Sequence, residues 1–155
     1  MTVESYKPQT IDETAVLELY HRLLEAWNGR DAHQFAHLFS GTAHIIGFDG
    51  SQLFGQAQVE AEFKSIFRDH PTGNYVAKVR DIRHLDSHCL LLSAVAGMIP
   101  AGHIGIDPAK NAVQSLVAVK NNAVWHIELF QNTPAQFHGR PELSESLANE
   151  LKELT

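Results

Sequence analysis

The chain has 155 residues, 44% of them hydrophobic, which is enough for one domain with its own core. A formal net charge of −6 and the lack of a Lys/Arg-rich run argue against a nucleic-acid partner, because such binding relies on clustered cations. No apolar run approaches the roughly 20 residues of a membrane helix, and the first residues lack a signal-peptide pattern, so we expect a soluble cytoplasmic protein.

The first half of the chain is predicted to be mainly helical. Thr10 and Glu13 have the spacing of a capping box, and apolar residues recur behind them at helical intervals as far as Trp27. Asp31 has the position of a second N-cap, and Gly41 is expected to end that shorter helix. The predicted elements are helices over about 11–28, 32–40 and 56–68 and a short strand over 43–48.

From Tyr75 onward the pattern changes to strands. Four segments rich in Val, Ile and Leu are separated by turn residues or by the longer loop 100–108. Short turns between successive strands predict antiparallel pairing. The strands are expected at 75–85, 88–98, 112–120 and 123–131, followed by a last helix from about Pro141.

Helices followed by strands, without β-α-β alternation, predict an α+β domain. We expect a pocket domain over residues 10–140 and a helical extension of the same domain over residues 141–155. The leucine stripe of that last helix is too short to be stable alone, so the helix must pack on its own sheet or on a second subunit.

The last strand ends in consecutive hydrogen-bonding side chains, and this is the strongest functional signal in the sequence. Small-molecule pockets use a few polar groups in an apolar lining to orient a ligand. Simple alternation places Gln131 on the apolar face with Trp125, Ile127 and Leu129, and Asn132 on the opposite face. We predict that Trp125 and Gln131 line a pocket, and that Asn132 either contacts the ligand or caps local backbone.

Asp49 and His44 are the candidate catalytic residues. Asp49 stands in a turn, where it is either a carboxylate at the pocket mouth that can accept a proton or a turn residue bonded to its own backbone. His44 alternates onto the same face as Phe48, and it is an acid–base group only if that face lines the pocket. Trp27, Phe48 and Gln114 complete the ligand-binding candidates, with an ordinary core position as the alternative for Trp27.

The ten histidines do not form a metal motif in the sequence. His33 and His37 share a helical face, but no acidic third ligand is fixed by the spacing and no His-Glu-x-x-His run occurs. The single cysteine, Cys89, lies in an apolar strand, where burial raises the pKa of a thiol and suppresses its reactivity. No phosphate loop or dinucleotide fingerprint is present. We therefore expect neither a metal nor an organic cofactor.

Two sets of motifs resemble known families. In the front half, WNGRD at 27–31, FDG at 48–50 and FG at 54–55 look like the nuclear transport factor 2-like (NTF2-like) superfamily. In the back half, AGMIP at 96–100, NAVQS at 111–115 and FQNTPAQFHGRP at 130–141 resemble the SgcJ/EcaC-type branch, which is related to SnoaL-like proteins. The resemblance implies three helices wrapped over a strongly curved antiparallel sheet, a cone with a pocket inside. With it we expect a homodimer formed through the sheet.

The ketosteroid isomerases of this superfamily give the resemblance a chemical test. They use an aspartate base that faces an oxyanion hole containing a tyrosine. Alignment on residues 29–31 and Phe39 places Leu23 at the tyrosine position and Gly47 at the aspartate position. Steroid-type isomerisation is therefore not expected.

Three functions remain compatible with the sequence. The first is a binding protein for a small apolar or amphipathic molecule that is, or descends from, a cofactor-independent isomerase, cyclase or hydrolase. The second is a non-catalytic dimerisation or ligand-binding module, which the missing isomerase pair favours. The third is the oxidoreductase that labels within the branch suggest, although no redox-cofactor motif supports it.

Overall fold

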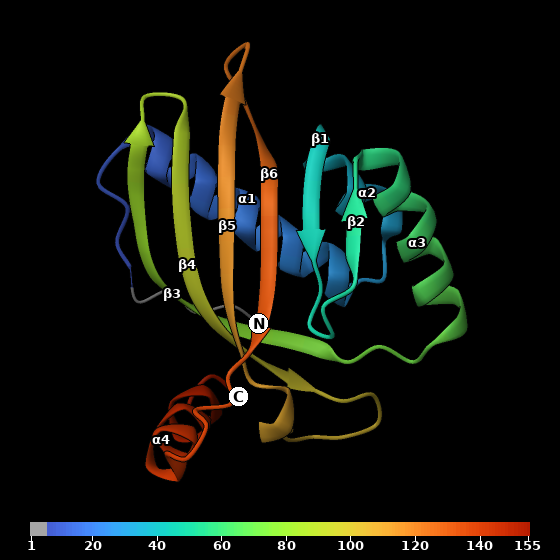
Figure 1. Cartoon of the computed structure of the whole chain (residues 1–155), viewed down its shortest axis with the longest axis vertical. Coiled ribbons are helices and arrows are strands. Elements are labelled where there is room, and N and C mark those ends of the chain that lie inside the picture. Colours follow the sequence, from blue (N-terminus) through green and yellow to red (C-terminus); the bar gives the residue numbers. More distant parts are fainter. Residues whose placement is uncertain (1–5) are drawn as a thin grey trace.

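The computed structural model describes residues 6–155 and has an α+β fold built on one curved sheet (Figure 1). The helices are α1 (Ile11–Asn28), α2 (Ala32–His37), α3 (Gln56–Asp69) and α4 (Pro141–Lys152), with a short 3-10 turn η1 (Pro108–Lys110). The strands are β1 (Phe39–Ile46), β2 (Gln52–Phe54), β3 (Asn74–Asp86), β4 (Cys89–Ile99), β5 (Ala112–Asn121) and β6 (Val124–Pro134). No helix within residues 6–155 is both long and apolar enough to cross a membrane.

The sheet is mixed, with the strand order β2-β1-β6-β5-β4-β3. Four neighbouring pairs are antiparallel, but β1 and β6 run parallel. The prediction of a wholly antiparallel sheet is therefore wrong at this pair. A parallel pair needs a long crossover, and here the whole chain between β1 and β6 supplies it. The predicted α+β class, the long strands and the C-terminal helix are confirmed.

Helix α1 crosses one face of the sheet and forms the centre of the core (Figure 1). Thr10 Oγ1 accepts a hydrogen bond from the Glu13 amide (3.0 Å), which confirms the predicted N-cap. Tyr20 and Leu23 are buried in the same cluster as Leu116 of β5. Complete burial of a large apolar side chain contributes about 2 kcal/mol, so this face of α1 holds the helix on the sheet.

The segment after α1 differs from the prediction. Helix α2 ends at His37 and β1 begins at Phe39, so Gly41 lies within a strand instead of ending a helix. Phe39 is fully buried and lies opposite Ile127 in the parallel pair, so tertiary packing outweighs the local helical pattern. Strand β2 has only three residues, too few to show alternation in the sequence, and it pairs with β1 where Leu53 lies opposite Ile45.

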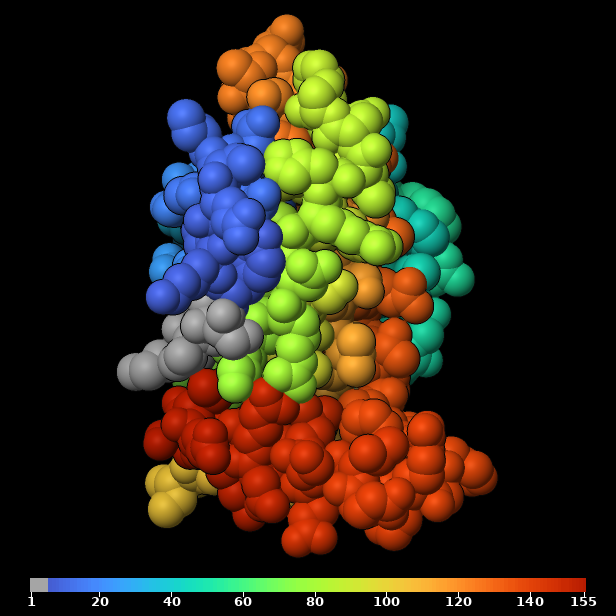
Figure 2. All heavy atoms as spheres, turned by 90° about the vertical axis from the view of Figure 1, so that its left-hand side faces the viewer, coloured from blue at the N-terminus to red at the C-terminus, as the bar shows by residue number. Residues whose placement is uncertain are grey.

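Helix α4 packs on its own sheet, one of the two predicted alternatives. Leu147 and Leu151 bury against Val95, on the face of β4 opposite to α1. Gly97 permits this approach, since a Cβ there would lie only 3.3 Å from Leu151 Cδ1. Figure 2 shows α4 and the segment before it covering one end of the molecule, while the β5–β6 turn projects from the other end.

Candidate ligand-binding site

A cavity of about 370 Å³ lies between α1, α3 and the part of the sheet formed by β1, β2 and β6. This volume is in the range of small-molecule sites. Most of its lining is apolar, with contributions from Leu23, Phe35, Ile45, Phe63 and Phe130. The lining side chains with a hydrogen-bonding group are Trp27, Asp49, Ser51, Glu62, Tyr75 and Asn132.

An aromatic cluster forms one wall of the cavity. The Trp27 ring packs against Phe63 (centroids 5.8 Å apart) and Tyr75 (5.2 Å), and Phe35 lies 4.3 Å from Phe63. Trp27 Nε1 donates to the Gly73 carbonyl at 2.9 Å. Because its only donor is already paired, the indole presents an apolar surface to the cavity.

A chain of four uncharged polar side chains runs through the core to this cavity. Tyr20 Oη donates to Gln114 Oε1 (2.6 Å), and Gln114 Nε2 donates to Asn132 Oδ1 (3.2 Å). Asn132 Nδ2 then donates to Tyr75 Oη at 3.1 Å. The chain fixes two groups at the cavity wall, a phenol and a primary amide.

Burial keeps both phenols of this chain protonated. Desolvation raises the pKa of Tyr20 and, separately, the pKa of Tyr75. The hydrogen bond from Asn132 opposes the rise at Tyr75, because an amide donor stabilises the phenolate. At neutral pH Tyr75 is therefore an uncharged phenol, and the cavity end of the chain carries no charge.

Asp49 lies at the solvent-exposed edge of the cavity, in the turn after β1. Its Oδ1 accepts a hydrogen bond from the Ser51 amide at 2.9 Å. This bond, joined by one from the Ser51 side chain, lowers the pKa of the Asp49 carboxyl group. Asp49 thus has both features considered for it, a turn bond to local backbone and a place in the cavity lining. It is ionised and weakly basic.

The structure brings together some of the predicted site residues and separates others. Trp27, Phe48, Asp49 and Asn132 line the cavity. Gln114 is fully buried one hydrogen bond behind Asn132, so it positions a lining residue without lining the cavity itself. The remaining three candidates, His44, Trp125 and Gln131, lie outside the lining.

A β-bulge in β6 explains the position of Gln131. Val117 of β5 pairs with Leu129 and Ala118 pairs with Ile127, which leaves Glu128 as an extra residue. One extra residue inverts the alternation of every residue beyond it. Ile127 therefore faces the core, and Phe130 and Asn132 face it after the bulge. Gln131 lies on the outer face, contrary to the predicted alternation.

His44 and Trp125 each have partners away from the cavity. His44 Nε2 lies 2.7 Å from Gln52 Oε1, and its ring stacks on the exposed Phe54 (centroids 4.3 Å apart). Trp125 Nε1 donates to Asp12 Oδ1 at 3.2 Å, beside the start of α1. In β1 it is Ala43 and Ile45 that are buried in the core, so His44 faces outward.

The sequence did not point to the two tyrosines of the polar chain. Tyr20 belongs to the apolar residues that recur at helical intervals before Trp27, and Tyr75 stands at the start of a predicted strand. Gln114 is separated by 94 residues from Tyr20, and Asn132 by 57 from Tyr75, so no local spacing connects them. A hydroxyl within an apolar stripe, which needs a buried partner, was the one available signal.

No family model and no curated protein matches this chain. Solved structures do match. A domain of unknown function with a cystatin-like fold from Nostoc punctiforme is 25% identical, with a TM-score of 0.79 over 90% of this chain and 86% of that one. An NTF-2 like protein of unknown function from Shewanella oneidensis has 16% identity and a TM-score of 0.66 over 79% of this chain and 99% of that one. A ketosteroid isomerase-like protein from Erwinia carotovora has 10% identity and a TM-score of 0.65, over 82% and 98%.

These likenesses, with the sheet order and helices above, define the fold as the nuclear transport factor 2-like cone. The cavity lies inside that cone. Leu23 and Gly47, which stand at the two aligned isomerase positions, both line the cavity and supply neither a hydroxyl nor a carboxylate there. Polar groups in this cavity come instead from Tyr75, Asn132 and the rim.

Proposed function

We propose that this chain binds a small, mainly apolar molecule in the cavity, and that Tyr75 and Asn132 hydrogen-bond its single polar group. The observation that carries this proposal is the pair Asn132 Nδ2–Tyr75 Oη (3.1 Å) in an otherwise apolar, aromatic wall. A hydroxyl or carbonyl group satisfies this pair better than a charge does, because Tyr75 and Asn132 are buried and uncharged.

Asp49 gives the site a second, weaker point of recognition. Its ionised carboxylate at the rim attracts a donor on the part of the ligand that faces solvent. In an isomerase, cyclase or hydrolase without a cofactor, this carboxylate would be the group that accepts a proton. Its lowered pKa makes it a poor base, so binding is the better supported role.

The same residues support membership of the SgcJ/EcaC-type branch as a proposal. The motif at 111–115 contains Gln114, and the motif at 130–141 contains Asn132. These two residues are hydrogen-bonded to each other in the polar chain. Two of the three motifs that suggested the branch are therefore joined in the polar chain, one at the cavity wall and one directly behind it.

The test is isothermal titration calorimetry with 2-naphthol and with naphthalene, which differ only by one hydroxyl group. We expect 2-naphthol to bind about tenfold more tightly, the effect of one net hydrogen bond of about 1.4 kcal/mol. Tyr75→Phe keeps the ring and removes the hydroxyl, so it should reduce this preference. Gln131→Ala is the matched control on the outer face and should leave both affinities unchanged. Equal affinities for the two probes, or no binding of either, would contradict the proposal.

Self-association through the outer face of the sheet is the second candidate function. Leu91, Val117 and Leu129 lie opposite one another across β4, β5 and β6 and are only partly covered. This apolar row, away from α1, suits the predicted homodimer. Sedimentation equilibrium should give a dimer for the parent chain and a monomer for Val117→Lys. Ile104→Lys, at a loop residue that is 99% exposed, should remain dimeric. A monomeric parent chain would rule this candidate out.

A further inference from the structure

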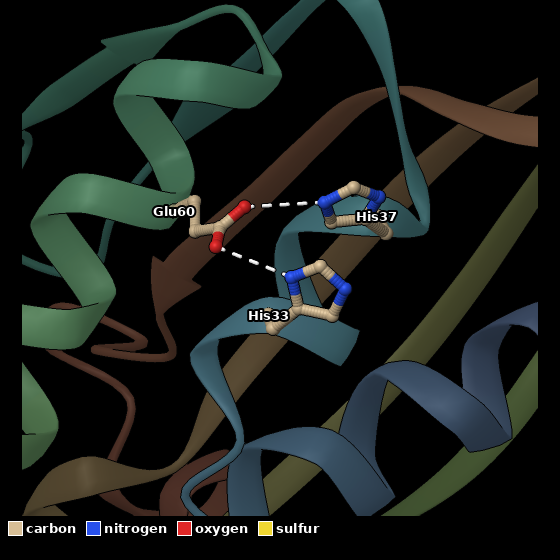
Figure 3. A group of neighbouring side chains, drawn as sticks. All are labelled: His33, His37 and Glu60. Atoms are coloured by element: carbon tan, nitrogen blue, oxygen red, sulfur yellow. Dashed lines mark hydrogen bonds and ion pairs between the residues drawn. The ribbon is translucent and has the colours of Figure 1, made fainter.

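Three potential metal ligands meet on the surface between α2 and α3 (Figure 3). His33 Nδ1 lies 3.2 Å from Glu60 Oε2, and His37 Nε2 lies 3.1 Å from Glu60 Oε1. The two imidazole rings face each other with centroids 4.0 Å apart. The cluster is outside the ligand-binding cavity, since none of the three residues lines it.

The fold explains why these side chains converge. His33 and His37 are one helical turn apart in α2, which places them on one face, as in metal-binding histidine pairs at this spacing. Glu60 comes from the first half of α3, which packs against α2 through Phe35 and Phe63 (centroids 4.3 Å apart). The acidic ligand that the spacing around His33 does not supply therefore arrives from a second helix.

We propose that His33, His37 and Glu60 form a binding site for a divalent transition-metal ion such as Zn²⁺. Imidazole and carboxylate are suitable ligands for this ion, and three protein ligands leave a fourth position for water. In a tetrahedral zinc site two ligand atoms are separated by about 3.3 Å, given metal–ligand bonds near 2.0 Å. The two nitrogen–oxygen separations, 3.2 Å to Oε2 and 3.1 Å to Oε1 of the Glu60 carboxylate, are close to this value. One donor atom from each of the three residues lies within 4.8 Å of the others.

Lys64 would compete with a metal ion for the Glu60 carboxylate. Its Nζ lies 3.3 Å from Glu60 Oε2, one helical turn along α3. The Lys64 side chain is 63% exposed, so its ammonium group can turn away into solvent when a metal ion takes the carboxylate. Removing this cation should strengthen metal binding, because the metal would no longer displace or repel a positive charge.

A metal ion here would clamp two walls of the cavity together. Phe35 on α2 and Phe63 on α3 both line the cavity, and the cluster joins the same two helices on their solvent side. The site is therefore structural: the ion ties α2 to α3 and stabilises the folded state by preferential binding.

The experiment is calorimetric titration of tag-free protein with ZnCl₂, together with thermal unfolding with and without Zn²⁺. We expect one ion per chain and a higher melting temperature in its presence. His37→Gln and Glu60→Gln should each weaken binding by more than about tenfold, the loss that even outer-shell changes cause. Lys64→Gln should bind Zn²⁺ more tightly than the parent chain. His103→Gln, an exposed loop histidine away from the cluster, is the control and should change neither quantity.

Two results would overturn the proposal. One is the absence of saturable Zn²⁺ binding to the parent chain. The other is binding that persists unchanged in the double variant His33→Gln/His37→Gln, since the ion would then be held by other histidines. Because all the substituted side chains are at or near the surface, circular dichroism without metal should be the same for every variant, so lost binding reports the ligands themselves.

Discussion

The apolar cavity and the attachment of α4 are stabilised by opposite kinds of polar interaction. At the cavity, Tyr20, Gln114 and Asn132 form a buried chain with no charge. At α4, Glu150 is ion-paired with both Lys78 and Arg80, and these groups are partly exposed to solvent. The Glu150 carboxylate lies 2.7 Å from Arg80 Nη2 and 3.2 Å from Lys78 Nζ.

This difference makes the two regions respond to opposite ends of the pH scale. The pKa of Tyr20 is raised by burial, so its contribution is complete below its ordinary pKa near 10 and is lost only as alkali ionises it. The pKa of Glu150 is lowered to about 2, so its contribution is complete above its ordinary value of 4.5 and is lost in acid. Neutral groups suit a cavity that must hold its shape, whereas charges suit a helix docked at the edge.

The largest expected effect comes from breaking the neutral chain at its centre. Gln114→Leu removes the partner of the Tyr20 hydroxyl and a donor to Asn132, and both of these groups are buried. An unsatisfied buried group costs about 1–3 kcal/mol, so we expect the free energy of unfolding to fall by about 4 kcal/mol. Urea denaturation followed by circular dichroism measures this change.

The double variant Tyr20→Phe/Gln114→Leu separates the hydrogen bond from general packing. With both partners apolar, position 20 no longer carries a hydroxyl that needs a buried partner. The cost of the double variant should therefore be smaller than the sum of the two single costs. Strict additivity would show that the Tyr20–Gln114 bond contributes nothing specific.

Much of the secondary structure around the polar side chains could be predicted from the sequence, because it depends on local patterns. Thr10 caps α1 through the Glu13 amide as its spacing indicates, and the four long strands follow the Val, Ile and Leu runs. Which side chains of β6 face the cavity depends on a shift of one residue in its register. The extra residue at Glu128 reverses the faces of β6, so Asn132 reaches the cavity and Gln131 does not. Alternation cannot reveal a bulge, because either register satisfies the same apolar pattern.

Contacts between distant segments could not be predicted from the sequence either. Glu60 meets His33 and His37 only because α3 folds back on α2, and Tyr75 meets Asn132 across the sheet. Helix–helix and cross-sheet neighbours depend on how elements pack, which spacing along the chain does not encode. The sequence shows which polar side chains lie in apolar stretches and require a hydrogen-bond partner, but it does not show which residues those partners are.

The smallest expected effect concerns the ion pairs that attach α4. Glu150→Gln removes the ion pairs of α4 with Arg80 and Lys78 while keeping the shape of the side chain. The side chains of Glu150 and Arg80 are 25% and 42% exposed, so solvent screening limits the loss to about 1 kcal/mol at pH 7. Thermal unfolding of the two chains between pH 7 and pH 2 measures the difference.

The pH dependence identifies the cause of that difference. The folded pKa of about 2 lies below the ordinary 4.5, so the parent chain should lose its advantage over Glu150→Gln progressively as the pH falls from 4.5 towards 2. Glu145→Gln is the matched control on the same helix, because Glu145 is exposed and has no ion pair within residues 6–155. At pH 7 its difference from the parent chain should be much smaller than that of Glu150→Gln. If the stability difference between the parent chain and Glu150→Gln is as large at pH 2 as at pH 7, the Glu150 side chain acts through packing. The attachment of α4 would then depend on charge no more than the polar chain at the cavity does.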